Sequence, residues 1–241
     1  MDGAFTLAAA VSYWDVDREK KLTLRGVFKF MQEAAILHAD QFDAGARSMD
    51  NRRASWVLNR VAASIIRYPA FEEKVRVVTW SSGIRAFKGF RDFRIYCGEE
   101  LVVAASSLWL HVDLATKSLT RVPRDLADRF PICAFGVHRP EIDKHGLAPP
   151  APGGNGTRVS LRFSDIDGNG HVNNTAYLDY LQTALAKRGF PPRPREVDIQ
   201  FIREVPPSVE DVNITLEGRD SAAGFRIDGS PELFAHGSAA F

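Results

Sequence analysis

The chain has 241 residues, a hydrophobic share of 45% and a formal net charge of +1 at pH 7. This balance gives no basic surface of the kind that nucleic-acid-binding domains use. Two cysteines, Cys97 and Cys133, are too few for a disulfide framework. No basic region precedes the first apolar residues, as a signal peptide would need, and no run approaches the ~18 apolar residues of a membrane span. These features predict a cytoplasmic globular protein with a sizeable core.

The first half of the chain is expected to form a strand, a helix and four further strands. Apolar and alternating residues predict strands at 5–14, 56–68, 74–80, 90–97 and 101–112. After Thr23, a suitable N-cap, apolar residues recur at helical spacing. Because consecutive strands joined by short turns pair most easily, we expect an antiparallel meander. A short surface helix is expected from Pro123 to Phe130.

Residues 148–156, with the sequence APPAPGGNG, have no apolar periodicity and are rich in residues that break helices and strands. We therefore expect an N-terminal domain at 1–147, a linker at 148–157 and a C-terminal domain at 158–241. The second domain is expected to repeat the order of the first. It has a strand at 158–163, a helix that ends near Arg188, and strands near 196–203, 211–217, 224–228 and 232–241.

The two halves also align residue by residue. YWDVDREKKLTLRGVFKFMQEA matches FSDIDGNGHVNNTAYLDYLQTA without a gap, at an offset of 165 − 15 = 150. Four positions are identical, pairing Asp15 with Asp165, Asp17 with Asp167, Gln32 with Gln182 and Ala34 with Ala184. Further on, SIIRYP resembles IQFIREVP. Internal duplication explains this pattern better than two unrelated domains.

The second half alone carries a polar set suited to chemistry. Asp167, Asn169 and His171 lie two residues apart before the second helix, so in an extended segment their side chains share one face. The first half has other residues at these aligned positions. Glu19 aligns with Asn169, Lys21 with His171 and Tyr68 with Glu204. A helix start offers unpaired N–H groups to a developing oxyanion, and His171 with Asp167 or Glu204 can activate water.

These parts fit hydrolysis of an activated acyl group. In the structural alternative, the aspartates end a strand, Asn173 or Asn174 caps the helix, and His171 and Glu204 are ordinary surface residues.

The sequence gives only weak evidence for other chemistries. His138 and His145 lie near Glu141 and Asp143 in a turn-like region, which is a weak basis for a metal site. GGNG at Gly153 lacks the strand-to-helix context of a phosphate loop, and G-x-S-x-G is absent. We expect no metal and no cofactor.

DIDGNGHVNNTAYLDYLQTA, followed by a strand ending FIREV, resembles the catalytic half of the fatty acyl-ACP thioesterases of plants and bacteria. YWDVDREKKLTLRGVFKFMQEAA and SWVLNRV resemble the N-terminal half of that family, so the resemblance covers nearly the whole chain. It implies an α+β fold of two tandem hot-dog domains, each a long helix wrapped by an antiparallel sheet. It also implies that the first domain accommodates most of the acyl chain.

By motif position, Asp167, Asn169 and His171 match the catalytic acid, amide and imidazole of the family, and Glu204 matches its downstream glutamate. Plant members often have a cysteine after that glutamate, whereas this chain has Val205, which excludes a thiolate there. The resemblance implies hydrolysis of acyl-ACP to a free fatty acid by activated water or carboxylate attack. An acyl-CoA thioesterase of the same fold, a non-catalytic acyl-binding module and a hydratase remain alternatives.

The implied partner is an acyl carrier protein bearing the acyl chain, and neither nucleic-acid binding nor a membrane span is expected. Six basic residues could bind the acidic surface of the carrier protein, or they could form a solvated face. They are Arg18, Lys20, Lys21, Arg85, Lys88 and Arg91. Candidate pocket residues are Phe28, Met31 and Trp56. Because the two halves can pair within one chain, a monomer suffices, and a homodimer is the alternative.

Overall fold

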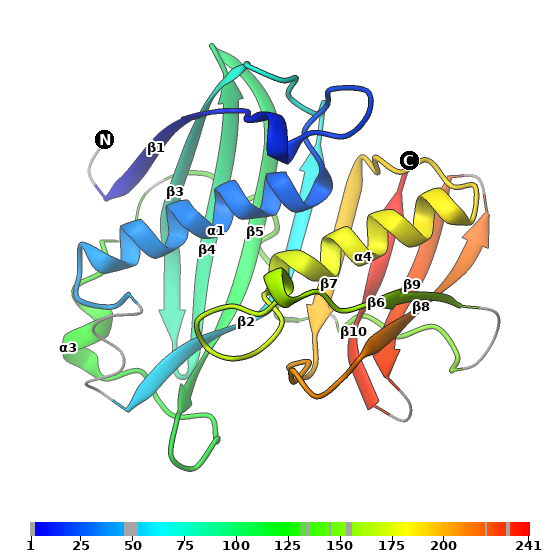
Figure 1. Ribbon diagram of the computed structural model, residues 1–241. Helices are drawn as coiled ribbons and strands as arrows, with labels where there is room; N and C mark the ends of the chain where they lie inside the picture. The colour runs from blue at the N-terminus through cyan, green and yellow to red at the C-terminus, as the bar shows by residue number, and fades with distance from the viewer. Residues whose placement is uncertain are drawn as a thin grey trace.

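The computed structural model describes residues 3–45, 53–131, 133, 135–144, 146–152, 156–219, 221–229 and 232–241. Within these ranges, ten strands form one antiparallel sheet in the order β1-β3-β4-β5-β2-β7-β10-β9-β8-β6. Two long helices lie side by side on the same face of the sheet (Figure 1). No helix in these ranges is long and apolar enough to cross a membrane.

The elements follow the order predicted for each half. The first half contains β1 (Ala4–Ala10), α1 (Leu24–Asp40), β2 (Ala54–Ile65), β3 (Lys74–Arg85), β4 (Lys88–Cys97), β5 (Glu100–Asp113) and the short α3 (Arg124–Ala127). The second half contains β6 (Thr157–Ser160), α4 (Asn174–Lys187), β7 (Glu196–Phe201), β8 (Asp211–Arg219), β9 (Ala222–Gly229) and β10 (Glu232–Ala240). Short 3-10 turns at Tyr13–Asp15 and Phe163–Asp165 precede the two long helices.

Two predictions for the first half are wrong in part. The strand expected at 5–14 ends at Ala10, because a 3-10 turn follows in which Ser12 Oγ donates to Asp15 Oδ2 at 2.6 Å. The strands also do not all pair in sequence. Only β3, β4 and β5 form a meander, and β2 lies between β5 and β7 because residues 66–73 lead the chain to the other side of β4 and β5.

The strand order shows the repeat directly. The first half is ordered β1-β3-β4-β5-β2, and the second half has the equivalent order β6-β8-β9-β10-β7. Strands β2 and β7 meet in the middle, where Ala62 pairs with Asp198. The alignment of Ile66 with Ile202 has an offset of 202 − 66 = 136, and 62 + 136 = 198. An approximate twofold axis therefore passes through the Ala62–Asp198 pair.

Both long helices begin at the caps that the sequence suggests. Thr23 Oγ1 accepts a hydrogen bond from Gly26 N at 3.0 Å, and Asn173 Oδ1 accepts one from Thr175 N at 2.9 Å. The apolar sides of α1 and α4 pack on the same face of the sheet, and one continuous core runs through both halves. Leu24 N donates to Gln182 Oε1 of α4 at 3.0 Å, so the start of α1 lies beside the second half of the chain.

Candidate active site

The polar segment before α4 is a tight loop. Asp167 N donates to His171 O at 2.9 Å, and Gly170 N donates to Asp167 O at 3.0 Å. Gly170 has a φ of 79°, in the left-handed region that favours glycine. The prediction that Asp167, Asn169 and His171 share one face of an extended segment is therefore wrong, because the chain turns between them.

The candidate residues form two separate pairs. Asp167 Oδ2 accepts from Asn173 Nδ2 at 3.1 Å, while Asp167 Oδ1 accepts from Asn169 N at 2.9 Å. His171 Nε2 lies 3.1 Å from Glu204 Oε2. The side chains of His171 and Glu204 are 37% and 56% exposed, so water reaches both. The fold thus brings Glu204 to the loop, and it adds Asn173, which the sequence indicated only as a helix cap.

Tyr177 of α4 holds the turn that carries Glu204. Its buried hydroxyl accepts from Val205 N at 3.2 Å and donates to Arg203 O at 3.4 Å. Burial raises the pKa of the Tyr177 hydroxyl, which therefore stays protonated as a donor. Val205 itself is fully buried. The turn around Glu204 is in this way anchored to the helix that follows the polar loop.

The first backbone N–H of α4 differs in its bonding from the equivalent group of α1. In the first half the equivalent group, Leu24 N, donates to Gln182 Oε1 at 3.0 Å. Gln32 is the counterpart of Gln182, but Asn174 N has no acceptor among the residues that the structure describes. Because a helix N-terminus carries partial positive charge, this N–H suits an oxygen that becomes negative.

A narrow, mainly apolar cavity adjoins this helix start. Asn174 and Thr175 form part of its lining, and first-half residues, including Phe28, Met31 and Val61, form the rest. Its free volume of about 20 Å³ has room for about one water, so a longer ligand must displace side chains. Phe28 and Met31 line the cavity, as the sequence predicts. Trp56 does not line the cavity and instead packs against His111 with ring centres 5.0 Å apart.

The equivalent loop of the first half is closed by ion pairs. Arg193 Nη1 donates to Asp17 Oδ2 at 3.0 Å, and Arg193 also pairs with Glu19. Tyr68, at the position of Glu204, is buried and donates to a backbone carbonyl at 2.8 Å. Asp17, Glu19 and Tyr68, the counterparts of Asp167, Asn169 and Glu204, are therefore engaged in contacts between the halves.

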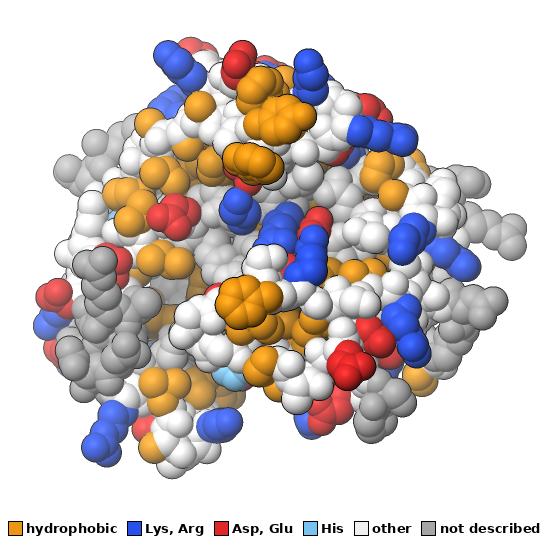
Figure 2. All heavy atoms as spheres, in the orientation of Figure 1, with side chains coloured by type: hydrophobic (Ala, Val, Ile, Leu, Met, Phe, Trp, Pro, Cys, Tyr) orange, Lys and Arg blue, Asp and Glu red, His pale blue; other side chains and the backbone are white. Residues whose placement is uncertain are grey.

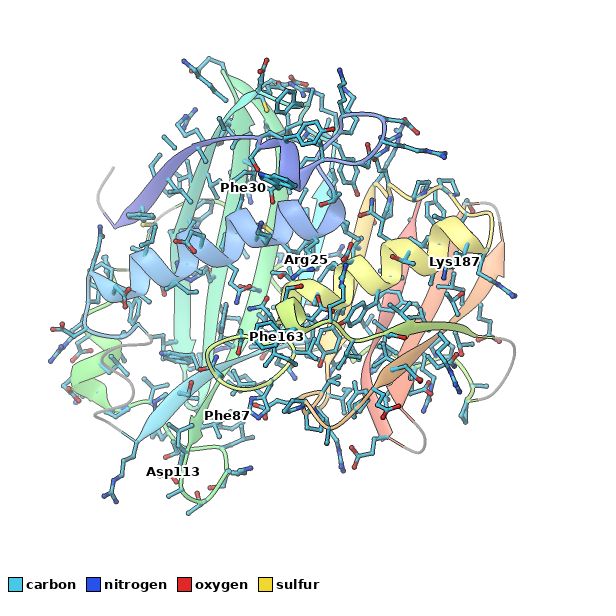
Figure 3. All side chains as sticks on the ribbon, viewed as in Figure 1. Arg25, Phe30, Phe87, Asp113, Phe163 and Lys187 are labelled. Atoms are coloured by element: carbon cyan, nitrogen blue, oxygen red, sulfur yellow. The ribbon has the colours of Figure 1, made fainter. Side chains whose placement is uncertain are left out.

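Asp165 is a buried carboxylate that joins the two helices. It accepts hydrogen bonds from Tyr180 Oη at 2.8 Å, Arg162 Nε at 3.2 Å and Arg25 Nη1 at 3.2 Å. Figure 3 shows Arg25 reaching from α1 toward α4. Burial acts to raise the pKa of Asp165, but the hydrogen bonds from Arg162 and Tyr180 outweigh it and the net pKa is lowered. These contacts give Asp165 a structural role.

Asp165→Asn is expected to lower the free energy of unfolding at pH 7 by about 3 kcal/mol, because it removes a fully buried anion from the ion pairs with Arg25 and Arg162. The matched control is Asp15→Asn, whose Lys29 partner is 52% exposed, and it should lose less than about 1 kcal/mol. Urea unfolding measures both, and equal losses would contradict the structural role. Since the pKa of Asp165 is lowered on folding, its stabilisation is present above the unfolded pKa of about 3.9 and is lost as pH falls below it.

The expected basic set is only partly available to a partner. Arg91 is buried, so its prediction as a surface contact is wrong. It lies two residues before Phe93 on β4, and both side chains are on the inner face of the sheet. Arg85 and Lys88 lie 3.0 Å from Asp143, which partly offsets their charge. Arg18, Lys20 and Lys21 are exposed. Figure 2 shows Lys and Arg side chains at several separate places on the helix-bearing face.

The weaker candidates from the sequence gain no support. His138 Nε2 lies 3.2 Å from Ser64 Oγ. His145 and Gly153 lie outside the described residues. In the part of the chain that the structure describes, no group of three or more His, Cys, Asp or Glu side chains is placed to hold a metal ion.

Two helix-and-sheet units joined through β2 and β7 define a double hot-dog fold. Solved structures with this fold include an acyl-ACP thioesterase from Bacteroides thetaiotaomicron, with a TM-score of 0.85 at 19% identity over 100% of this chain and 98% of that one. Another is the 12:0-ACP thioesterase from Umbellularia californica, with a TM-score of 0.84 at 19% identity over 100% and 97% of the two chains.

The sequence defines the family within this fold. The acyl-ACP thioesterase N-terminal domain matches residues 3–130, and the C-terminal domain of that family matches residues 153–230. The chain belongs to the acyl-ACP thioesterase family. It is 26% identical over 194 residues to an oleoyl-acyl carrier protein thioesterase of Coriandrum sativum, covering 73% of this chain and 52% of the relative. It is 26% identical over 195 residues to a dodecanoyl-[acyl-carrier-protein] hydrolase of Cinnamomum camphora, covering 73% and 50%. The chain thus spans about half the length of the curated relatives it matches.

Proposed function

We propose that this protein hydrolyses the thioester of fatty acyl-ACP to a free fatty acid and ACP. The observation that carries the proposal concerns Asn174, which follows the loop of Asp167 and His171. This residue lines a mainly apolar cavity, and its backbone N–H has no acceptor among the described residues. Family membership supports the reaction class, because the relatives are named as hydrolases or thioesterases of acyl carrier protein.

In this proposal the acyl chain enters the first-half cavity, and its thioester carbonyl lies at the start of α4. Asn174 N–H donates to the carbonyl oxygen, and this bond strengthens as the oxygen becomes negative. In the second half, two buried tyrosines, Tyr177 and Tyr180, occupy the interior, and we do not expect the acyl chain to enter there. We accordingly propose that 1–147 holds the chain, that 158–241 supplies the polar groups, and that 148–157 links them.

His171 and Glu204 form the proposed base. Glu204 orients the imidazole, which takes a proton from the attacking water. The water oxygen bonds to the carbonyl carbon, the carbon–sulfur bond breaks, and the imidazolium returns the proton to the departing thiolate. Asp167 is fixed by Asn169 N and Asn173 Nδ2, so it can help to position the water. Direct attack by Asp167 on the carbonyl carbon is the alternative route.

Turnover of acyl-ACP and acyl-CoA of equal acyl length tests this function. We expect free thiol from both carriers, with kcat/KM higher for acyl-ACP by at least about tenfold, because a carrier protein adds contacts to exposed basic residues. A preference for acyl-CoA would instead assign the acyl-CoA thioesterase reaction. Tight binding with no thiol released would assign a non-catalytic acyl-binding module, and hydration without thiol release would assign a hydratase.

A further inference from the structure

Arg91 of β4 is a buried cation inside the first half. Its residue is 7% exposed, and its side chain points to the helix-bearing side of the sheet, because it contacts His38 of α1. Phe93, two residues along the same strand, shares that face and lines the cavity. A guanidinium in such an apolar interior needs partners to offset the loss of its hydration.

The partners that it has are few and uncharged. Arg91 Nη1 donates to Thr79 Oγ1 at 3.1 Å and to His38 Nδ1 at 2.9 Å. Burial lowers the pKa of Arg91 to about 10 and, with the neighbouring guanidinium, the pKa of His38 to about 4. At pH 7 Arg91 is therefore charged and His38 is neutral. Among the described residues, the N–H groups on Nε and Nη2 have no acceptor, and no carboxylate pairs with Arg91.

Arg91 lies on β4, which of the three strands in the cavity lining is the farthest from the second half, to which Asn174 belongs. On α1 the cavity is lined by residues up to Gln32, and His38 lies 38 − 32 = 6 residues further on. Six residues correspond to about 9 Å along the helix axis. Ser107, which lines the cavity, is also the cross-strand neighbour of Arg91. A chain that starts at Asn174 and follows α1 therefore ends near this guanidinium.

The chemistry of that end selects against a methyl group. A hydrocarbon terminus cannot satisfy the N–H groups on Nε and Nη2 and would further enclose an unpaired charge. These two nitrogens form one edge of the guanidinium fork, which matches the two oxygens of a carboxylate. An anion bound there would also supply the counter-charge that the protein itself does not provide.

We propose that Arg91 binds a carboxylate at the end of the acyl chain remote from the thioester, so that the preferred substrates are ω-carboxyacyl thioesters. This inference rests on the proposed function, since it takes the cavity as the acyl site. It names the chemical class of the chain end, and it assigns to Arg91 the role of a specificity residue that takes no part in bond breaking.

The test compares two series of acyl thioesters of matched length, one ending in a methyl group and one in a carboxylate, with the wild type, Arg91→Met and Arg91→Lys. The wild type should have the higher kcat/KM for the carboxylate-ended series. Arg91→Met should lower that kcat/KM about 10- to 100-fold while the methyl-ended series is unchanged or faster. Arg91→Lys keeps the charge but not the planar guanidinium. Its kcat/KM for the carboxylate-ended series should lie between those of the wild type and Arg91→Met.

A binding measurement separates this inference from the proposed function. Calorimetry with amide analogues, which cannot be hydrolysed as the thioesters are, should show tighter binding of the carboxylate-ended chain by the wild type and no such preference by Arg91→Met. If no thioester of either series is hydrolysed, the proposed function fails, and the calorimetric comparison still decides the inference. Thermal melting checks the fold of Arg91→Met, which should not be less stable because it removes an unpaired buried charge.

Two results would overturn the inference. The first is a wild type that hydrolyses and binds both chain ends equally. The second is inhibition by free fatty acid that Arg91→Met abolishes, without any wild-type preference for carboxylate-ended substrates. In that case Arg91 binds the carboxylate of the product, inserted in the reverse direction, and the substrate chain ends in a methyl group.

Discussion

Replacing His171 with alanine is expected to lower kcat for acyl-ACP hydrolysis about 10²- to 10⁴-fold, the usual contribution of a positioned general base. The substitution removes the partner of Glu204 and leaves no side chain to take the proton of the attacking water. KM should change little, because His171 does not line the apolar cavity. Steady-state release of free thiol gives both constants.

The approximate twofold axis provides a matched control for this prediction. Lys21 occupies the position of His171 in the first half, so Lys21→Ala should leave kcat within about twofold of the wild type. Circular dichroism and thermal melting of His171→Ala should match the wild type, since the side chain is 37% exposed. Turnover of a folded His171→Ala at the wild-type rate would remove His171 from the proposed site.

Asp167→Asn is expected to lower kcat about 10²- to 10³-fold. The amide oxygen can still accept from Asn169 N, so the loop is retained. The new NH₂ group, however, would face the NH₂ group of Asn173, and the negative charge is lost. Both effects displace the group that we propose to position water or to attack the carbonyl. Single-turnover kinetics measure the chemical step directly.

Asp17→Asn is the control for this second prediction. Asp17 is the first-half counterpart of Asp167 and pairs with Arg193, so its substitution should change stability slightly and leave kcat unchanged. If Asp17→Asn and Asp167→Asn lowered kcat equally, the loss would reflect loop structure in both halves, and the assignment of Asp167 would fail.

Much of the fold could be predicted from local pattern. The caps at Thr23 and Asn173 and the helical spacing after them locate both long helices, and the offset of 150 residues reveals the repeat. The partners of β2 could not be predicted. Periodicity shows that a segment is a strand, but pairing with β5 and β7 depends on contacts far along the chain. The same limit explains the mistaken meander.

The candidate site was predictable in composition but not in conformation. The spacing of Asp167, Asn169 and His171 drew attention to the loop, whereas backbone bonds and Gly170 determine its turn. The sequence could not predict the difference between the two helix starts, because both halves have the same glutamine. Gln182 accepts a bond from Leu24 N, whereas no equivalent bond to Gln32 is present among the described residues.

The position of Arg91 could have been recognised from the sequence. In GFRDFRIY, Arg91 alternates with Phe93 and Ile95, both of which are buried, and a strand places such residues on one face. The charge of Arg91 alone suggests a surface position, but the two-residue period of the strand indicates an interior one. Composition therefore suggested a partner contact where the strand pattern indicated an interior charge.

Hydrolysis in H₂¹⁸O tests the central claim most directly. Wild-type protein incubated with acyl-ACP should release free thiol and fatty acid in equal amounts, with ¹⁸O incorporated into the fatty acid carboxylate over many turnovers. His171→Ala under the same conditions should release about 1% of that product or less. A wild-type protein that binds acyl-ACP but releases neither thiol nor labelled fatty acid would contradict the account.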